Sequence, residues 1–136
     1  MPGEAGATLL RVVVFIPVYH GVVNMLRDLL DSLDAYLGAS CRVIVVDDHT
    51  TDDTAVRLEA LQLERDGLTV LRNDVNQGWG FGIYKNFARA ALHALSAEPF
   101  DVFLKLDHDS LLIAPHVARV LQRCSRGRHW VDGFGA

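Results

Sequence analysis

The chain alternates between short, continuously apolar runs and longer segments whose apolar residues recur every three or four positions. Continuous runs rich in Val and Ile are typical of strands buried on both faces, and the longer spacing is typical of amphipathic helices. The apolar runs cover residues 11–16, 42–46, 68–72 and 101–106. The sequence therefore predicts four strands separated by helices.

The predicted helices cover residues 22–37, 81–95 and 115–124, and a further helix begins within residues 50–54 and ends at residue 67. Residues 130–134 are expected to begin a fifth strand. The apolar positions that mark the second helix are Val56, Leu58, Leu61 and Leu63, and those of the third are Phe87, Ala88, Ala91, Leu92 and Leu95. Strands that alternate with helices in this way indicate an α/β fold with a parallel sheet and right-handed crossovers.

Polar residues collect directly after the last apolar residue of each strand. These loops are residues 17–20, 47–51, 73–82 and 107–110, and Pro17 is expected to close the first strand because proline cannot donate to the ladder. In a parallel sheet all four loops lie along the carboxyl edge, where open α/β sheets bind their ligands. We therefore expect a functional site at that edge.

Two carboxylates one residue apart, Asp107 and Asp109, end the fourth apolar run. Carboxylates so close repel each other and raise one pKa unless a cation lies between them. Such oxygen ligands suit Mg²⁺ or Mn²⁺, which commonly also bind substrate phosphates. The pattern predicts a divalent metal that holds a phosphorylated substrate, and the alternative is a polar turn whose acids cap the next helix.

Each of the other polar loops also admits two interpretations. Tyr19 either covers the end of the sheet or stacks beside a nucleobase. Of Asp47 and Asp48, one is free to accept a hydrogen bond from a base or a ribose, because Thr50 or Thr51 already suits the helix cap. Gly78 and its neighbouring glycines either form a plain turn or let backbone N–H groups approach phosphates.

Cations and imidazoles also occur near this edge. Lys105 lies on an apolar strand and is expected to pair with Asp47 or Asp48, or else with phosphates, because a buried lysine needs a partner. Lys85 and Arg72 are either surface cations or phosphate neighbours. His20, His49 and His108 lack the spacing of a zinc site, so no zinc is predicted.

Composition limits the class of protein. The chain has 136 residues, half of them hydrophobic, with no linker, which indicates a single domain over 1–136 whose residues 1–9 form a tail. The net charge of −4 argues against a nucleic-acid partner and against a polybasic membrane surface. An acidic protein that handles phosphates must supply cations locally, which favours a bound metal.

The predicted location is cytoplasmic. Cys41 and Cys124 are far apart and fit a reducing compartment better than a disulfide framework. The first residues lack the basic segment of a signal peptide. The apolar run at 9–18 contains Arg11 and is too short to span a bilayer, so no transmembrane segment is expected.

Four segments, in this order and spacing, carry a resemblance to a known family. They read VFIPVYHG at residues 14–21, IVVDDHTTDDT at 44–54, NQGWG at 76–80 and LDHD at 106–109. Over residues 10–115 the chain resembles the inverting glycosyltransferases of family 2, which have the GT-A fold. The resemblance implies a Rossmann-like, three-layer α/β/α domain with a mainly parallel sheet, cut off soon after the LDHD motif.

The resemblance assigns the nucleobase side of the site to the first two loops. Pro17, Val18 and Tyr19 would border the base of a nucleotide-diphosphate sugar. Asp48 would hydrogen-bond that base. His20 stands where the family commonly has Asn, a change that would tune the base or sugar pocket.

The resemblance assigns the diphosphate side to the later loops. Asn76, Gly78 and Lys85, in the glycine-rich loop and the following helix, would close over the nucleotide. Asp107 would contact the ribose or the water shell of the metal. Asp109 would ligate Mn²⁺ or Mg²⁺ bridging the diphosphate, while an acceptor hydroxyl attacks the anomeric carbon with inversion.

The acceptor side is expected to lie outside this chain. The family places its acceptor-binding half and its general-base carboxylate well beyond the metal motif, whereas residues 110–136 hold one acid, Asp132. Asp132 falls in the predicted fifth strand and is not nominated as the base. Residues 116–136 are expected to begin the acceptor half, and the acceptor itself, a glycan, a lipid or a protein, is left open.

Two alternatives compete with glycosyl transfer. The first is a nucleotide-binding module without transfer activity. The second is a phosphatase of the haloacid-dehalogenase type, whose motif also reads apolar strand, Asp-X-Asp and a small residue. That superfamily carries the motif on its first strand, whereas here three strand–helix units precede Asp107, which disfavours it.

Overall fold

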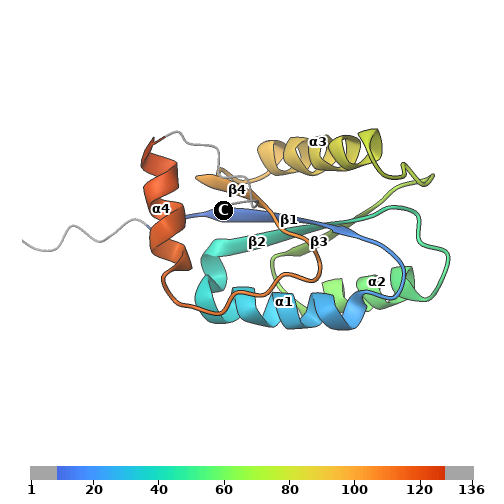
Figure 1. Ribbon diagram of the computed structural model, residues 1–136, viewed down its shortest axis with the longest axis horizontal. Coiled ribbons are helices and arrows are strands. Elements are labelled where there is room, and N and C mark those ends of the chain that lie inside the picture. Colours follow the sequence, from blue (N-terminus) through green and yellow to red (C-terminus); the bar gives the residue numbers. More distant parts are fainter. Residues whose placement is uncertain (1–8, 128–136) are drawn as a thin grey trace, which may run out of the picture.

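The computed structural model describes residues 9–127 as four strands and four α-helices around one sheet (Figure 1). The elements are β1 (Val12–Val18), α1 (Val23–Tyr36), the 3₁₀ turn η1 (Gly38–Ser40), β2 (Cys41–Asp47), α2 (Thr54–Glu64), β3 (Leu68–Arg72), α3 (Phe81–Ser96), β4 (Val102–Lys105) and α4 (Val117–Gly127). All neighbouring strands are parallel and follow the order β3-β2-β1-β4. The predicted α/β fold with a parallel sheet is confirmed.

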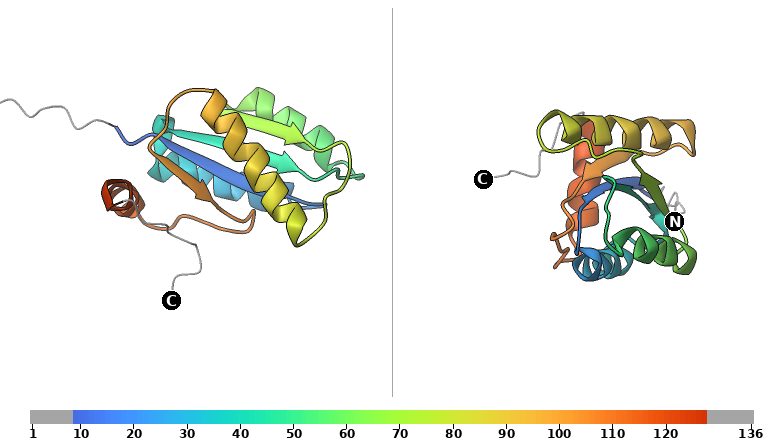
Figure 2. Two further views of the ribbon diagram at one scale, coloured as in Figure 1. Left: turned by 90° about the horizontal axis from the view of Figure 1, so that it is seen from above. Right: turned by 90° about the vertical axis from the view of Figure 1, so that its right-hand side faces the viewer.

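The strands are continuously apolar because helices cover both faces of the sheet. On β1, Val12, Val14, Ile16 and Val18 pack in the core that α1 and α2 share, and Val13 and Phe15 pack in a second core under α3. Figure 2 shows the resulting layers, with α3 on one side of the sheet and α1 and α2 on the other. Burial of alternate side chains on opposite faces removes the polar alternation of a half-exposed strand.

Pro17 lies inside β1 and does not close it, which corrects the predicted strand end. The Phe15 carbonyl accepts from Leu106 on the β4 side, and the Val18 carbonyl accepts from Asp48 on the β2 side. Alternation along the strand therefore turns the nitrogen of Pro17 toward the β4 side. The pairing of β1 with β4 ends at Phe15 and Lys105, so no ladder hydrogen bond is lost there.

Two helices bury only part of the apolar positions that mark them in the sequence. In α2 the buried apolar residues are Leu58 and Leu61, whereas Val56 is 68% exposed and Leu63 is 89% exposed. In α3 the buried stripe is Gly82, Asn86, Ala90 and Ala94, whereas Leu92 and Leu95 are 67% and 70% exposed and Ala88 is exposed. Small residues let α3 lie close to the sheet, and this proximity outweighs the greater apolar area of the leucines.

The remaining predicted boundaries differ by small shifts. Strand β2 is longer by one residue at each end, β4 is shorter by one at each end, and α4 begins two residues later and runs on to Gly127. Helix α1 is shorter than predicted by one residue at each end, and Gly38 begins η1. The predicted strand at 130–134 lies outside the described residues.

After β4 the chain returns along α1 to the amino edge of the sheet. The Leu112 N–H donates to Ser32 Oγ of α1 at 3.1 Å. Helix α4 then lies near the amino end of β1, as Figure 1 shows, and a hollow of about 290 Å³ between them is lined by Leu9, Leu10, Val12, Tyr36, Leu37, Ser40, Ala118, Arg119 and Gln122. No helix within residues 9–127 is both long and apolar enough to cross a bilayer.

Candidate functional site

The strand order creates a switch point at the carboxyl ends of β1 and β4. From β1 the chain adds β2 and β3 on one side and then returns to place β4 on the other side of β1. Open α/β sheets bind ligands in the crevice at such a point. The loops that begin at Tyr19 and at Leu106 flank it, and the loops after β2 and β3 lie along the same edge, as the sequence predicts.

Strand alternation decides which polar side chains face this crevice. Val18 packs on the α1 side of the sheet, so Tyr19 extends on the α3 side. The same parity places Asp48 on the α3 side, because Val46 packs there, and Asp47 on the α1 side. Phe103 packs under α3. Lys105 and Asp107 follow it by two and four residues, so the same alternation places them on the α3 side.

Asp48 is the centre of the polar contacts on the α3 side. Its side chain is only 1% exposed. Oδ1 accepts from Asn73 Nδ2 at 2.8 Å and from the Gln77 N–H at 2.8 Å, and Oδ2 accepts from the Gly78 N–H at 3.2 Å and from the Tyr19 hydroxyl at 3.4 Å. Four donors use the acceptor capacity of this carboxylate and join the first three loops.

Asp48 is held by a buried amide network of Asn73 and Asn86, which the sequence did not predict. Asn73 Nδ2 also donates to Asn86 Oδ1 of α3 at 2.6 Å, and Arg89 Nη1 donates to Asn73 Oδ1 at 2.7 Å. Asn73 and Asn86 are 7% and 4% exposed. One signal for this network was available, because Asn86 shares four-residue spacing with Gly82 and Ala90 on a face that is otherwise small and apolar.

Asp47, in contrast, is a structural residue. It is 1% exposed, and its Oδ2 pairs with Arg72 Nη1 at 2.9 Å, directly opposite in the β2–β3 register. Its Oδ1 accepts from the Thr50 N–H at 2.9 Å, and Arg72 Nη2 donates to the Thr50 carbonyl at 2.8 Å. Both terminal nitrogens of the Arg72 guanidinium are thus bound by Asp47 and Thr50.

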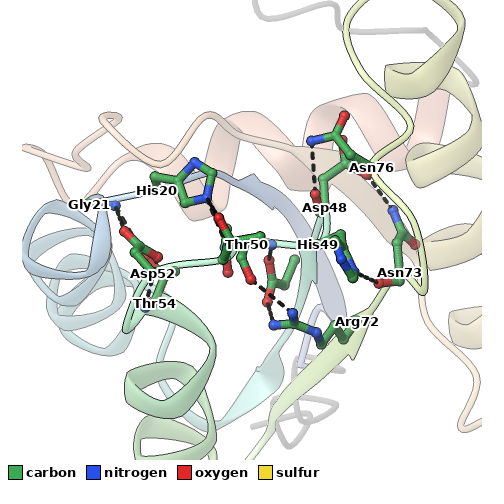
Figure 3. Close-up of polar contacts among 12 residues, drawn as sticks. His20, Gly21, Asp48, His49, Thr50, Asp52, Thr54, Arg72, Asn73 and Asn76 are labelled. Atoms are coloured by element: carbon green, nitrogen blue, oxygen red, sulfur yellow. Dashed lines mark hydrogen bonds and ion pairs between the residues drawn. The ribbon is translucent and has the colours of Figure 1, made fainter.

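The imidazoles of the second and first loops also bind neighbouring loop atoms. His20 Nε2 accepts from the Thr51 N–H at 2.9 Å, and His49 Nδ1 lies 3.2 Å from the Asn73 carbonyl (Figure 3). His49 has φ of 60°, a left-handed conformation that is uncommon outside glycine. Within residues 9–127 no three His, Cys, Asp or Glu side chains are grouped as metal ligands.

The two carboxylates after β4 occupy a tight turn. The Ser110 N–H donates to the Asp107 carbonyl at 3.0 Å, and both Asp107 and Asp109 are exposed. Lys105 Nζ pairs with Asp107 Oδ1. The predicted ion pair of Lys105 is thus present, but its partner is Asp107, two residues farther along the chain in the turn after β4, rather than Asp47 or Asp48.

The glycine-rich loop after β3 is held onto Asp48 by its own polar groups. Asn76 Nδ2 donates to the Asp48 carbonyl at 3.1 Å, which Figure 3 shows. Gly78 has φ of 71°, and its N–H is one of the donors to Asp48. Lys85 Nζ lies 3.4 Å from Gln77 Oε1, so this exposed cation is near the same loop.

Two aromatic rings cover the crevice next to Asp48. The rings of Tyr19 and Trp79 are parallel within 4°, with centroids 5.3 Å apart. Trp79 is 78% exposed, and the sequence analysis gave it no role. Partial burial, then the negative charge of Asp48 and its hydrogen bond, raise the pKa of Tyr19 above its ordinary value.

The raised pKa of Tyr19 predicts a distinct alkaline titration. The neutral hydroxyl donates to Asp48, so this interaction is complete below the ordinary tyrosine pKa, near 10, and is lost as the pH rises through the higher folded pKa. In a 295 nm absorbance titration, one of the three tyrosines ionises late. This late component disappears in Tyr19→Phe, and a late component that persists in the variant contradicts the assignment.

Comparison with known proteins gives a family match over most of the chain. The family model described as "Glycosyl transferase family 2" matches residues 13–133. No curated protein gives a significant match. The family model is not that of the haloacid-dehalogenase phosphatases, whose motif the Asp107–Asp109 spacing alone also admits.

Solved structures are similar over the same region. Mannosyltransferase PcManGT from Pyrobaculum calidifontis, in complex with GDP-Man and Mn²⁺, is 25% identical with a TM-score of 0.60, over 84% of this chain and 32% of that chain. S. aureus TarS 1–349 is 24% identical with a TM-score of 0.58, over the same shares. Its complex with UDP is 20% identical with a TM-score of 0.58, over 93% of this chain and 38% of that chain.

These neighbours confirm the GT-A fold predicted from the resemblance. The TarS matches are under 25% identical and bear on the fold alone. The chain spans about a third of the length of each of these structures.

Proposed function

The chain belongs to glycosyltransferase family 2, and from this premise we propose that it binds the nucleotide-diphosphate sugar donor of a glycosyl transfer reaction. The observation that carries the proposal is the position of two groups of side chains, one on each side of the β1–β4 switch point. Tyr19 and Asp48 offer a ring and a carboxylate on one side, and the turn of Asp107 and Asp109 offers two exposed carboxylates on the other.

The carboxylates after β4 fit a divalent metal that is shared with a substrate. Mg²⁺ and Mn²⁺ are commonly bound by one or two carboxylates together with phosphate oxygens and water, rather than by a cage of protein ligands. Asp109 makes no side-chain hydrogen bond within residues 9–127, so its oxygens are available. PcManGT, a family relative by fold, was solved with Mn²⁺ and GDP-Man.

In the proposed complex Asp109 ligates the cation, and Asp107 contacts the ribose or the water shell of the cation. The cation would supply Lewis-acid neutralisation of the diphosphate leaving group. Lys105, already paired with Asp107, adds a positive charge beside the same turn. These residues position the donor and stabilise the charge of the leaving group, which is where such displacements gain most of their rate.

The nucleobase side of the proposed site comprises Pro17, Val18, Tyr19 and Asp48. Tyr19 stacks on the base, and Asp48 accepts a hydrogen bond from it. Asn76 and Gly78 from the glycine-rich loop, which already contact Asp48, and Lys85 from α3 border the nucleotide.

The activity of the whole protein is part of the proposal. We propose transfer of the sugar to an acceptor hydroxyl with inversion, in the cytoplasm or at the cytoplasmic face of the membrane. We propose that the acceptor-binding residues and the general base lie outside residues 9–127. A module that binds nucleotide without transferring sugar is the alternative within the same family. Both alternatives predict metal-dependent nucleotide binding.

Metal-dependent nucleotide binding tests the proposal. Calorimetry with UDP, GDP and dTDP, with and without Mn²⁺, is expected to find one nucleotide whose affinity rises at least about tenfold, about 1.4 kcal/mol, when Mn²⁺ is added. Asp109→Ala is expected to abolish that increase, because it removes the proposed ligand. Asp74→Ala is the matched control, since it removes an exposed carboxylate from another loop on the same edge and leaves the Mn²⁺ increase intact.

Two outcomes contradict the proposal. Failure of all three nucleotides to bind removes the donor site. An undiminished Mn²⁺ increase in Asp109→Ala removes the metal from the turn after β4.

A further inference from the structure

The Tyr19–Trp79 pair is too close to admit a base between its rings. A base stacked between two aromatic rings lies about 3.5 Å from each, so the rings must be about 7 Å apart. In this structure the centroids are 5.3 Å apart and the rings are parallel within 4°. A nucleobase that stacks on this face of Tyr19 must therefore be accompanied by a displacement of Trp79.

The surroundings of Trp79 permit that displacement. Its side chain is 78% exposed, so little burial is lost when it moves. Gly78 and Gly80 flank it with φ of 71° and 78°, and a side chain added at Gly80 would meet nothing within 4 Å. The two glycines place the indole on a short segment that has open space beside it.

The same displacement would free an acceptor on Asp48. The two longest contacts of this carboxylate, 3.2 Å from the Gly78 N–H and 3.4 Å from the Tyr19 hydroxyl, both end on Oδ2. The donors belong to Tyr19 and to the residue directly before Trp79. The shorter contacts, both 2.8 Å, end on Oδ1 and come from Asn73 and Gln77, which would stay in place.

We propose that Trp79 is a base-stacking residue of the donor-base pocket: its side chain moves away from Tyr19 and stacks on the outer face of the bound base. One movement then provides a stacking face on Tyr19 and a free acceptor at Asp48 Oδ2. In the bound state the base contacts both rings, and these two contacts replace the single Tyr19–Trp79 contact of this structure. This inference rests on the proposed nucleotide site and gives a role to Trp79, a residue of the NQGWG segment to which the family resemblance assigned none.

The test uses nucleoside monophosphates without metal, which report the base side alone. In the full chain carrying Trp130→Phe, Trp79 is the only tryptophan, so its fluorescence reports stacking directly. UMP, GMP and dTMP are titrated in EDTA, and the corresponding diphosphates in Mn²⁺. We expect quenching of Trp79 by the nucleotide that binds best.

In the chain with both native tryptophans, calorimetry then measures the contribution of Trp79 to affinity. Trp79→Ala is expected to weaken the monophosphate and the diphosphate by the same factor, about tenfold, because base–aromatic stacking contributes on this scale. Trp79→Phe is expected to retain affinity within about threefold. Phe81→Ala, which removes an aromatic ring that is 85% exposed two residues away, is expected to change affinity less than twofold.

The outcomes separate this inference from the proposed function. Equal or tighter binding by Trp79→Ala overturns the inference, because the indole would then be idle or in competition with the base, while a Mn²⁺ increase that depends on Asp109 leaves the proposed function standing. If Mn²⁺ does not raise the affinity of the native chain, or if the increase is undiminished in Asp109→Ala, while Trp79→Ala still weakens binding, the proposed metal site fails and the inference stands. No binding of any nucleotide overturns both. Thermal unfolding of each variant shows that the affinities compare folded proteins.

Discussion

Gly82→Ala is expected to lower the free energy of unfolding by about 2–3 kcal/mol, although alanine is the better helix former. A Cβ at this position would lie 2.4 Å from the Gln77 carbonyl oxygen and 2.6 Å from its carbonyl carbon. Both are backbone atoms, so α3 or the glycine-rich loop must shift to relieve the overlap. Overpacking at a buried position commonly costs 1–3 kcal/mol.

The sign of the change makes this prediction sharp. Within a helix, glycine to alanine ordinarily stabilises by about 1 kcal/mol. Ala88→Gly, at an exposed position of α3, is the matched control and is expected to lower the free energy of unfolding by about 1 kcal/mol through propensity alone. Urea denaturation measures both variants, and a Gly82→Ala chain as stable as the native one would show that the loop has room.

The loop shift also predicts a functional result for Gly82→Ala. Gln77 lies next to Gly78, and the N–H groups of both donate to Asp48. Displacement of Gln77 therefore loosens the Asp48 carboxylate and the segment that carries Trp79. Folded Gly82→Ala is expected to bind the best nucleotide at least about fivefold more weakly, with the Mn²⁺ increase preserved, and calorimetry measures both quantities.

Asp47→Ala is expected to destabilise the fold by about 2–3 kcal/mol. The substitution leaves the Arg72 guanidinium and the Thr50 N–H without their acceptor at a position that is 1% exposed. Breaking a buried ion pair by removing one partner costs 3–5 kcal/mol. The expected value is lower here because the Arg72 side chain is 41% exposed and keeps part of its hydration.

A surface pair provides the control for Asp47. Asp34 pairs with Arg65 at 2.9 Å, but its side chain is 74% exposed. Exposed pairs contribute 0–1 kcal/mol, so Asp34→Ala is expected to change stability by less than about 1 kcal/mol. Asp47→Asn, which retains an acceptor for the Thr50 N–H, is expected to lie between the two alanine variants. Equal urea midpoints for Asp47→Ala and Asp34→Ala would contradict the structural role of Asp47.

Local sequence patterns were sufficient to predict the strands and helices and the edge of the sheet that carries the polar groups. Four Val- and Ile-rich runs became four parallel strands, because strands covered by helices on both faces need no polar alternation. The polar loops follow these runs in the sequence, so parallel strands bring them to one edge whatever the strand order. The four spaced motifs likewise carried the family resemblance that the match over residues 13–133 confirms.

The distinction between neighbouring residues of one type needed the tertiary structure. Asp47 and Asp48 are equivalent in sequence, and the side of β2 that each faces decides that one binds Arg72 and the other binds the loops after β1 and β3. The apolar positions that mark α3 in the sequence include Leu92 and Leu95, but close approach to the sheet selects Gly82, Asn86 and Ala90 for its buried face. Hydrophobicity along a helix does not report which face has room for large side chains.

The sequence by itself thus determined the α/β elements, the polar edge and the Asp107–Asp109 turn, because each of these depends on residues close together in the chain. The tertiary structure decided the strand order, the partner of Lys105 and the pairing of Tyr19 with Trp79. Tyr19 and Trp79 are 60 positions apart in the sequence. Such contacts depend on which strands are neighbours and on the path of a glycine-rich loop, and periodicity in one segment holds no information about either.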